Sequence, residues 1–523
     1  MKAKSYHEWF LRHQEYLTAE LAKKHSKSQE ESGEGASLSV EVVTYSHLKN
    51  YILSGESQPD ILIACDDDGH LTDYAVQLIC DFFLENPRIN MVYGDEDQVA
   101  DGAFVNPWFK ADWSPDTFLS TFYFGSIFAI RSSTLGLINP GKRTAQEFES
   151  ESRILEDAVE EQEARRNEPD TALRSWIYGK LCLKVAQADG GFSRRRGEEL
   201  PVGHIAEILF HADKKPEPWD ADLIRDSLTG RYSAESATTR LISIIIPSKD
   251  NPALLERCVR SIIQHAHVPF ELIIVDNGSR EDNRARTQAL VDEINNGDMA
   301  ASYIYKKMPF NMAGMNNLGA AAANGEMLLF LHDDVEIRKS GWLSHLSEKA
   351  KLPYVGAVGM KLLYPDSNLI QHAGIMSVED GPVYKLQYKS NGEVWYHGFN
   401  KGVRNVLALS GACIMVRRDV FTEAGGFDEQ NFPDVFTNVD FCYRVYENGY
   451  YNVVRNNMYL YYFDPVSEEN LETLEQREKN RPAELEALDR LHPGRRGNDP
   501  FYHRYLARES SEVRFVPSLE LED

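Results

Sequence analysis

The sequence predicts an α/β fold with a parallel β-sheet, and two strands with the helix between them lead to this prediction. LISIIIPSKD (241–250) is a β-branched run with the length of a strand buried on both faces. Helical apolar spacing follows at 253–266, and FELIIVDNGS (270–279) gives a second buried strand. Strand, helix and strand in this order form a βαβ unit.

Polar residues follow both of these strands. Pro247 and Lys249 lie at the end of the first strand, and Asp276 and Asn277 lie at the end of the second. Ligands of open α/β sheets bind beyond the carboxyl ends of the strands. We therefore expect these four residues on one edge of the sheet, beside a ligand.

A third strand adds two carboxylates to the same edge. The small-residue helix NMAGMNNLGAAAANG (311–325) leads into MLLFLHDDVEI (327–337), in which Asp333 and Asp334 follow a buried strand. An exposed turn is the simplest interpretation of aspartates at a strand end. Convergence with Asp276 favours a site for a divalent cation and a nucleotide diphosphate instead.

The composition of the 523-residue chain narrows the function classes. A formal net charge of −25 argues against a protein that wraps nucleic acid or binds broadly to anionic lipid. No apolar run approaches the ~18 residues of a membrane helix, and the start is too charged for a signal peptide. Six cysteines without a CxxC pair predict neither a zinc cluster nor a disulfide framework. We expect a cytoplasmic protein without a transmembrane segment.

The chain also contains a weak internal repeat. ILIACDDDGHL (61–71) is similar to MLLFLHDDVEI, and GSIFAIRSSTL (125–135) is similar to GACIMVRRDVF (411–421), in the same order. Two such pairs indicate two related domains, with a boundary near residue 240. The first copy has no counterpart of the strands that are expected to hold a nucleotide. A polar stretch at 23–37 is predicted as a loop or mobile segment.

The C-terminal half resembles family 2 glycosyltransferases. The similarity includes the segments quoted above together with NVDFCYRVYENGY and DPFYHRYL, and it extends over nearly all of 241–505. The subgroup is similar to the two-domain, rhamnosyltransferase-like enzymes of bacterial surface polysaccharide assembly. The resemblance implies a GT-A fold, which is a Rossmann-like nucleotide-diphospho-sugar transferase fold, at 241–505. A truncated related domain without a donor site would precede it at 1–240, and a tail would follow at 506–523.

The resemblance places a nucleotide-sugar donor at the strand ends. Pro247 and Lys249 would shape the nucleotide pocket, and Asp276 would face the base. Asn316 would lie on the helix that approaches the diphosphate. The structural alternatives are a solvated strand end for Lys249, a helix surface for Asn316 and a turn for Asp276.

The family's metal motif is matched by Asp333 and Asp334, with Asp334 as the direct ligand of Mn²⁺ or Mg²⁺. The chain departs from the family in the strand that usually carries a histidine ligand. Tyr462 and Phe463 stand there, so the cation would lose a nitrogen ligand unless Asp464 reaches it.

The family also implies direct displacement with inversion, in which a carboxylate takes a proton from the acceptor hydroxyl. Asn438 occupies the usual base position in FPDVFTNVDFCYR (432–444), and an amide cannot act as a base. Asp440 and Asp434 are the remaining candidates. The charged segment 470–491 is predicted as a solvated covering helix, with docking to a partner as the alternative.

The first domain is a second candidate for activity. It keeps three aspartates at 66–68, and His211 and Asp170 could stand in the metal and base positions. The absence of a nucleotide-binding half argues against this alternative, and the aspartates are then a relic or an interaction surface.

The predicted function is sugar transfer from a nucleotide-sugar donor to a bacterial surface glycan or lipid-linked acceptor, at the inner face of the membrane. The alternative is an impaired paralogue that binds donor or glycan and organises other glycosyltransferases. A dehydrogenase is disfavoured because no GxGxxG follows either strand after residue 241.

Overall fold

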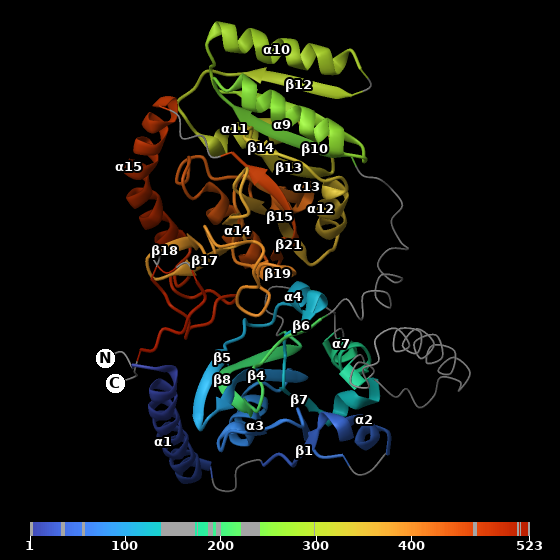
Figure 1. The fold of residues 1–523 in the computed structure, drawn as a ribbon, viewed down its shortest axis with the longest axis vertical. Coiled ribbons are helices and arrows are strands. Elements are labelled where there is room, and N and C mark those ends of the chain that lie inside the picture. Colours follow the sequence, from blue (N-terminus) through green and yellow to red (C-terminus); the bar gives the residue numbers. More distant parts are fainter. Residues whose placement is uncertain are drawn as a thin grey trace, which may run out of the picture.

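The computed structural model describes residues 4–32, 37–54, 58–137, 173–174, 176–186, 192–194, 200–220, 241–297, 299–463, 468–509, 512 and 514–520. Two domains are stacked along the long axis of the molecule, with the N-terminal domain below the C-terminal domain in Figure 1. The last residues of the chain return to the N-terminal domain, so that both termini lie beside helix α1 (Tyr6–Ser32).

The C-terminal domain is built on a ten-stranded sheet in the order β12-β11-β10-β13-β20-β15-β21-β14, with β16 and β19 paired outside this path. The first four strands are parallel, β20 is antiparallel to both of its neighbours, and β15 and β21 are again parallel. This is the expected GT-A architecture. The strands are β10 (Ile242–Ser248), β11 (Phe270–Asp276), β12 (Ala300–Tyr305), β13 (Met327–Leu331), β14 (Val335–Glu336), β15 (Val355–Leu363), β16 (Ile370–His372), β19 (Val403–Val406), β20 (Cys413–Arg417) and β21 (Tyr451–Tyr462), beside the hairpin β17 (Ile375–Val378) and β18 (Gly381–Tyr384).

Helices cover this sheet, and α11 packs closely against it. A Cβ atom at Gly319 would lie only 2.3 Å from Ile245 Cγ2 of β10, so the small residues of α11 allow its backbone to approach the strands. Helix α15 runs along one side of the domain (Figure 1). The helices are α9 (Pro252–His265), α10 (Glu281–Asn295), α11 (Met312–Ala322), α12 (Trp342–Ala350), α13 (Arg418–Glu423), α14 (Thr437–Glu447) and α15 (Glu468–Leu491).

The N-terminal domain has a seven-stranded sheet in the order β1-β2-β7-β4-β8-β3, with β5 paired to β4. Strand order and directions match the path β10-β13-β20-β15-β21-β14 of the other domain. In the described residues no strands correspond to β11 and β12. The strands are β1 (Val40–Thr44), β2 (Ile61–Cys65), β3 (Gly69–Leu71), β4 (Met91–Ala100), β5 (Ala103–Trp108), β7 (Ile127–Arg131) and β8 (Val202–Ala212), beside the short pair β6 (Thr121–Phe122) and β9 (Trp219–Asp220).

Helix α1 corrects one sequence prediction. It continues through Ser32, so residues 23–32 of the polar stretch predicted as a loop are helical. Polar residues such as Lys, Glu and Gln are good helix formers, and this explains why polarity alone misled the prediction. The other helical segments of the domain are α2 (Tyr45–Ser54), α3 (Ala75–Glu85), α4 (Pro115–Ser120), α7 (Leu183–Ala186), a 3₁₀ segment (Ser132–Leu137) and a π segment (Trp176–Cys182).

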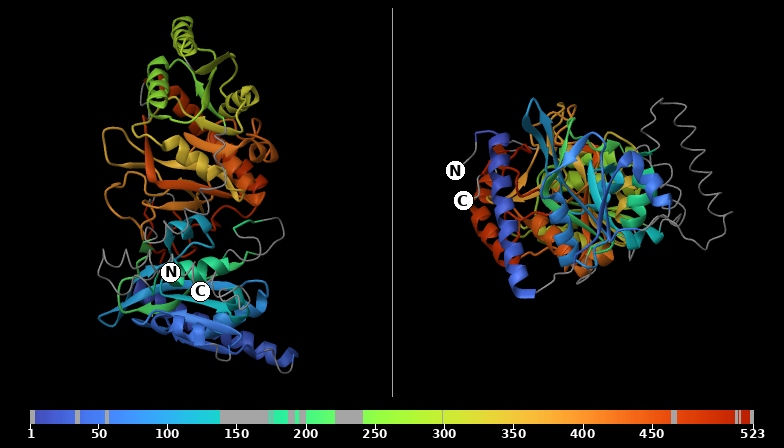
Figure 2. Two further views of the ribbon diagram at one scale, coloured as in Figure 1. Left: turned by 90° about the vertical axis from the view of Figure 1, so that its right-hand side faces the viewer. Right: turned by 90° about the horizontal axis from the view of Figure 1, so that it is seen from below.

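The interface between the two domains contains both polar and apolar contacts. Helix α4 lies against β19, where the Val403 N–H donates to Ser120 Oγ at 2.8 Å. Lys349 pairs with Asp116 at 2.7 Å across the same interface. Figure 2 shows α4 between the two sheets in a second view. Buried apolar side chains of both domains also form one continuous cluster.

A buried network ties the end of the chain to the first domain. Asp95 lies 3.0 Å from His204 Nε2 and 2.8 Å from His503 Nε2. Such a trio could bind a metal ion. However, the Tyr505 N–H donates to His503 Nδ1, which leaves the proton on Nε2, facing Asp95. We interpret the trio as a buried ion-pair network.

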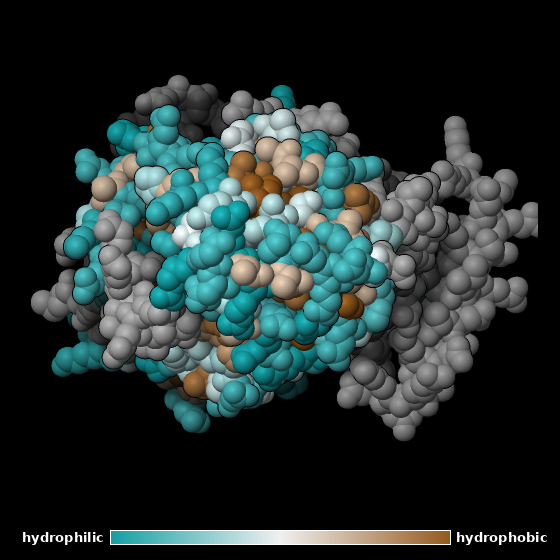
Figure 3. Space-filling view, turned by 90° about the horizontal axis from the view of Figure 1, so that it is seen from above, coloured by the Kyte–Doolittle hydropathy of each residue, from teal (hydrophilic) through white to brown (hydrophobic). Residues whose placement is uncertain are grey.

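The outer face is polar at one end of the molecule. Figure 3 views the end that carries α10 and β12, and hydrophilic side chains cover most of it, with small apolar patches between them. Among the described residues, no helix combines the length and apolarity needed to cross a bilayer.

Candidate donor and transfer site

Three neighbouring strands end at one edge of the C-terminal sheet. The register places Ser248, the last residue of β10, beside Asp276, the last residue of β11. Ser248 also donates its hydroxyl to Asp333 Oδ2 at 2.6 Å. The predicted convergence of Asp276 and Asp333 on one edge is therefore present in the structure.

Asp276 is 1% exposed and is held by two hydrogen bonds. Its Oδ1 accepts the Ser279 N–H at 2.8 Å, and its Oδ2 accepts the Tyr303 hydroxyl at 2.5 Å. Burial, followed by the hydrogen bond to Asp276, raises the pKa of Tyr303. Asp276 thus stabilises the turn after β11, which agrees with the structural alternative, and contact with a nucleotide base stays a prediction.

The end of β10 has one buried and one solvated candidate. Pro247 is buried within the strand, whereas the Lys249 side chain is exposed. Asp250 follows at a φ of 52° and accepts the Arg280 N–H at 2.8 Å and Asn283 Nδ2 at 2.9 Å. Sequence reasoning missed Asp250, although a polar residue two positions before Pro252 is a turn signal.

Two buried amides beside these strand ends have unsatisfied atoms in the described part of the chain. Asn316, on α11, is 6% exposed, and its Oδ1 has no hydrogen-bond partner. Asn277 is 2% exposed, and its Nδ2 has none. The helix-surface interpretation of Asn316 is therefore wrong. A buried unsatisfied polar atom costs about 1–3 kcal/mol, so both amides are suited to a polar ligand.

The two aspartates of the metal motif differ in their surroundings. Burial raises the pKa of Asp333 to about 6, although hydrogen bonds from Ser248 and Asn251 oppose the shift. Asp334 is 7% exposed, and its backbone carbonyl accepts the Phe463 N–H at 2.9 Å. Two carboxylates are sufficient for Mg²⁺ or Mn²⁺ when phosphate oxygens and water complete the coordination, so these residues fit a donor-bound cation.

The usual histidine ligand has no replacement at the described strand end. The ring of Tyr462 lies 6.1 Å from that of His332, and the ring of Phe463 is covered by Arg257 at 4.5 Å. Burial, followed by the charge of Arg477, lowers the pKa of His332 to about 4. Asp464, the suggested substitute, lies outside the described residues.

Asn438 and Asp440 both make structural contacts at the start of α14. Asn438 Nδ2 donates to the Leu409 carbonyl. The buried Asp440 accepts Arg444 Nη2 at 2.5 Å on one oxygen and lies 3.0 Å from His492 Nε2 with the other. Both of its oxygens are engaged, one by Arg444 and the other by His492.

Asp434 lies in the loop before α14 and is 7% exposed. Arg477 Nε lies 3.0 and 3.2 Å from its two oxygens. Burial raises the pKa of Asp434 against the opposing charge of Arg477. The charge of Arg477 also lowers the pKa of His332, the residue before the metal motif. The sequence prediction of a covering helix at 470–491 gave no indication that Arg477 reaches this site.

Comparison with known proteins gives the family of the C-terminal domain. The model for "Glycosyl transferase family 2" matches residues 243–425, which include the ends of β10, β11 and β13. Residues 243–425 form a family 2 glycosyltransferase domain.

The chain is also similar to curated bacterial proteins. It is 28% identical to the uncharacterized protein y4gI of Sinorhizobium fredii over 86% of the chain and 48% of the relative. It is 32% identical to the O-antigen biosynthesis protein RfbC of Myxococcus xanthus, over 69% of the chain and 27% of the relative. A Campylobacter jejuni GalNAc(5)-diNAcBac-PP-undecaprenol beta-1,3-glucosyltransferase is 32% identical over 24% of the chain and 40% of the relative. The chain thus spans half or less of the length of these relatives.

In the N-terminal domain, Asp67 and Asp68 correspond in position to Asp333 and Asp334, and both already have partners within the chain. Asp67 accepts Ser46 Oγ at 2.5 Å, and Asp68 pairs with Lys214. His211 Nδ1 lies 2.5 Å from Asp97 Oδ1, beneath α1. Asp170, the candidate base of this domain, lies outside the described residues.

Proposed function

We propose that the family 2 domain transfers a sugar from a nucleotide-sugar donor to a glycan or lipid-linked acceptor of the bacterial surface, with inversion. The observation that carries the proposal is the sheet edge at which Ser248 lies beside Asp276 in the strand register and donates a hydrogen bond to Asp333, inside the matched family region. The names of the relatives support a surface glycan or a polyprenol-linked acceptor.

The nucleotide would lie over the ends of β10 and β11. Pro247 forms the buried floor, the exposed Lys249 is free to follow an anionic donor, and Asp276 fixes the turn beside the base. Asn316 Oδ1 and Asn277 Nδ2 supply an acceptor and a donor for polar groups of the nucleotide sugar.

Asp333 and Asp334 would hold Mn²⁺ or Mg²⁺ together with the donor phosphates. The cation would stabilise the negative charge on the departing diphosphate. Ser248 orients Asp333 through the hydrogen bond at 2.6 Å, so one carboxylate oxygen is fixed before the donor arrives.

We assign the base to Asp434 and a positioning role to Asp440. Asp434 is buried with a raised pKa, and a pKa closer to neutrality favours general base catalysis. Its partner Arg477 keeps the carboxylate in place on the side of the metal motif. Asp440 instead fixes the start of α14 through Arg444 and His492.

The N-terminal domain is, in this proposal, a truncated relative without a donor site. Its sheet repeats the strand order of the second domain without the two strands that carry the nucleotide edge, and its aspartates are paired internally. The proposal places the chain in the cytoplasm, at the inner face of the membrane, beside the glycan and other glycosyltransferases.

The test is release of nucleotide diphosphate from a panel of UDP-, dTDP- and GDP-sugars, with and without Mn²⁺ or Mg²⁺. We expect one donor class to turn over and Asp334→Ala to abolish its turnover. The matched control is Asp68→Ala, which changes the corresponding exposed aspartate of the first domain and should leave turnover unchanged. Equal loss in both variants, or turnover that survives Asp334→Ala, would contradict the proposal.

A further inference from the structure

Arg404 of β19 is a buried cation without a counter-ion in the described part of the chain. Arg404 is 6% exposed. Its Nη2 donates to the Gly398 carbonyl at 2.8 Å, and its Nε has no hydrogen-bond partner. Burial lowers the pKa of Arg404 to about 10. An unpaired buried charge is costly, so it needs a compensating ligand.

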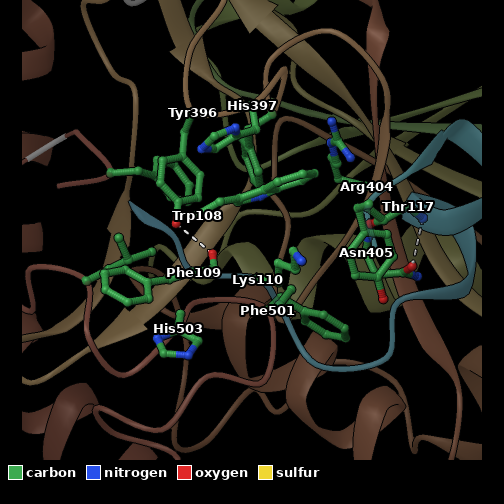
Figure 4. A pocket seen from close by; sticks show the side chains of 15 residues that line it. Trp108, Phe109, Lys110, Thr117, Tyr396, His397, Arg404, Asn405, Phe501 and His503 are labelled. Atoms are coloured by element: carbon green, nitrogen blue, oxygen red, sulfur yellow. Dashed lines mark hydrogen bonds between the residues drawn. The ribbon is translucent and has the colours of Figure 1, made fainter. Parts of the chain in front are cut away.

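Arg404 lines a cavity of about 60 Å³ between the two domains. One water molecule needs roughly 10–15 Å³ on this measure, so the cavity can hold a group of several atoms. Figure 4 shows Arg404, Trp108, His397 and Lys110 around the same space. The residues come from both domains, and none of them belongs to the strand ends of the donor site.

The cavity is electropositive in an otherwise acidic protein. Burial, followed by the charges of Lys215, Lys110 and Arg404, lowers the pKa of His397 to about 3. Lys110 is balanced by Glu96 at 3.3 Å and donates to two backbone carbonyls. The interface carboxylate of Asp116 is engaged by Lys349. Among these described charges, Arg404 is the cation that remains uncompensated.

The aromatic wall of the cavity is held in a strained backbone. Tyr396 and His397 have φ values of 39° and 52°, a conformation that non-glycine residues seldom adopt. The Tyr396 hydroxyl donates to the Phe109 carbonyl at 2.6 Å, and the His397 ring stacks on Trp108 at 4.5 Å. Contacts with the first domain therefore keep this wall in place, as is common for ligand sites.

We propose that the interdomain cavity binds a compact oxyanion, phosphate or carboxylate in class, through Arg404. A guanidinium presents a planar set of N–H donors that matches two oxygens of such a group. The volume suits a small group, and the exposed Lys215 nearby adds some favourable potential, whereas Lys110 is already balanced by Glu96. The oxyanion comes either from a free ion or from a substituent on a saccharide.

The test compares thermal unfolding of the full chain in phosphate, acetate and glucose 6-phosphate with chloride at equal ionic strength. Phosphate also stabilises proteins by exclusion from their surface, so the decisive quantity is the difference between wild type and Arg404→Gln. We expect a saturable rise of Tm with phosphate in wild type. In the variant, the apparent affinity for phosphate should be at least about tenfold weaker, as loss of a charge-assisted hydrogen bond predicts. A response to glucose 6-phosphate but not to phosphate would assign the saccharide source.

Arg417→Gln is the matched control, because Arg417 is also buried but donates to the carbonyls of Ala350, Leu352 and Val355. It should lower Tm while it retains the phosphate response. If Arg404→Gln does not fold, phosphate binding by wild type and by Arg404→Lys is compared through the ³¹P NMR line broadening of phosphate. Equal anion responses in wild type and the Arg404 variant, or no saturable response in wild type, would overturn the proposal.

Discussion

The two domains share one strand order, but the aspartates at corresponding positions have different surroundings. In the C-terminal domain, Asp333 faces the end of β10 and is oriented by Ser248. In the N-terminal domain, Asp67 accepts a hydrogen bond from Ser46, and Asp68 forms an ion pair with Lys214. The C-terminal sheet also carries β11 and β12, which the proposed function places beside the nucleotide. The comparison teaches that the same strand order can place an aspartate motif beside two further strands in one domain and without them in the other.

The largest effect is expected at the proposed base. Asp434→Asn should lower kcat by about 10²–10⁴, because the amide cannot accept the proton of the acceptor hydroxyl. KM for the donor should change little, since Asp434 lies outside the nucleotide edge. Steady-state kinetics with the identified donor and acceptor provide the measurement. Normal kcat in this variant would remove Asp434 from the base position.

Asp440→Asn should instead reduce stability. Loss of the carboxylate leaves Arg444 and the buried His492 without their common partner, and breaking a buried ion pair costs roughly 3–5 kcal/mol. Urea unfolding measures the free energy. If the variant is as stable as wild type but inactive, Asp440 rather than Asp434 is the base.

The network that anchors the chain end to the first domain should respond to pH. Burial alone would lower the pKa of His204, but Asp95 and Asp112 raise it to about 9. Because this exceeds the ordinary value of 6.5, the stabilisation is complete below about pH 6.5 and is lost as pH rises through 9. His204→Gln should cost up to about 3 kcal/mol at pH 6, and the difference from wild type should shrink above pH 9. A difference independent of pH would contradict the charged state of His204.

A smaller effect is expected where α11 packs against β10. Gly319→Ala introduces a Cβ atom at 2.3 Å from Ile245 Cγ2, and relief of such a clash costs about 1–3 kcal/mol. The shift of α11 should also weaken donor binding through Asn316. Gly102→Ala is the control for a glycine with open space, although its φ of 75° adds a small strain. Tm and donor affinity of both variants test the prediction, and an unchanged affinity in Gly319→Ala would separate α11 from the donor site.

Sequence reasoning was strong where a pattern is local. The buried runs at 241–250 and 270–279 predicted adjacent parallel strands, and the positions of Asp276 and Asp333 at their edge followed from strand polarity. It was weak where contacts join distant segments. Nothing near Asp434 indicates Arg477, which lies 43 residues away on α15. Arg404 likewise shows that it has no counter-ion among the described residues only after both domains are in place.

The most direct test of the central claim is hydrogen–deuterium exchange with and without the donor that turns over. The account predicts new protection in the segments 247–251, 276–280, 311–317 and 332–335, and unchanged exchange at 65–72 of the first domain. Protection at 65–72 with none at the ends of β10 and β11 would place the donor in the N-terminal domain and contradict the account.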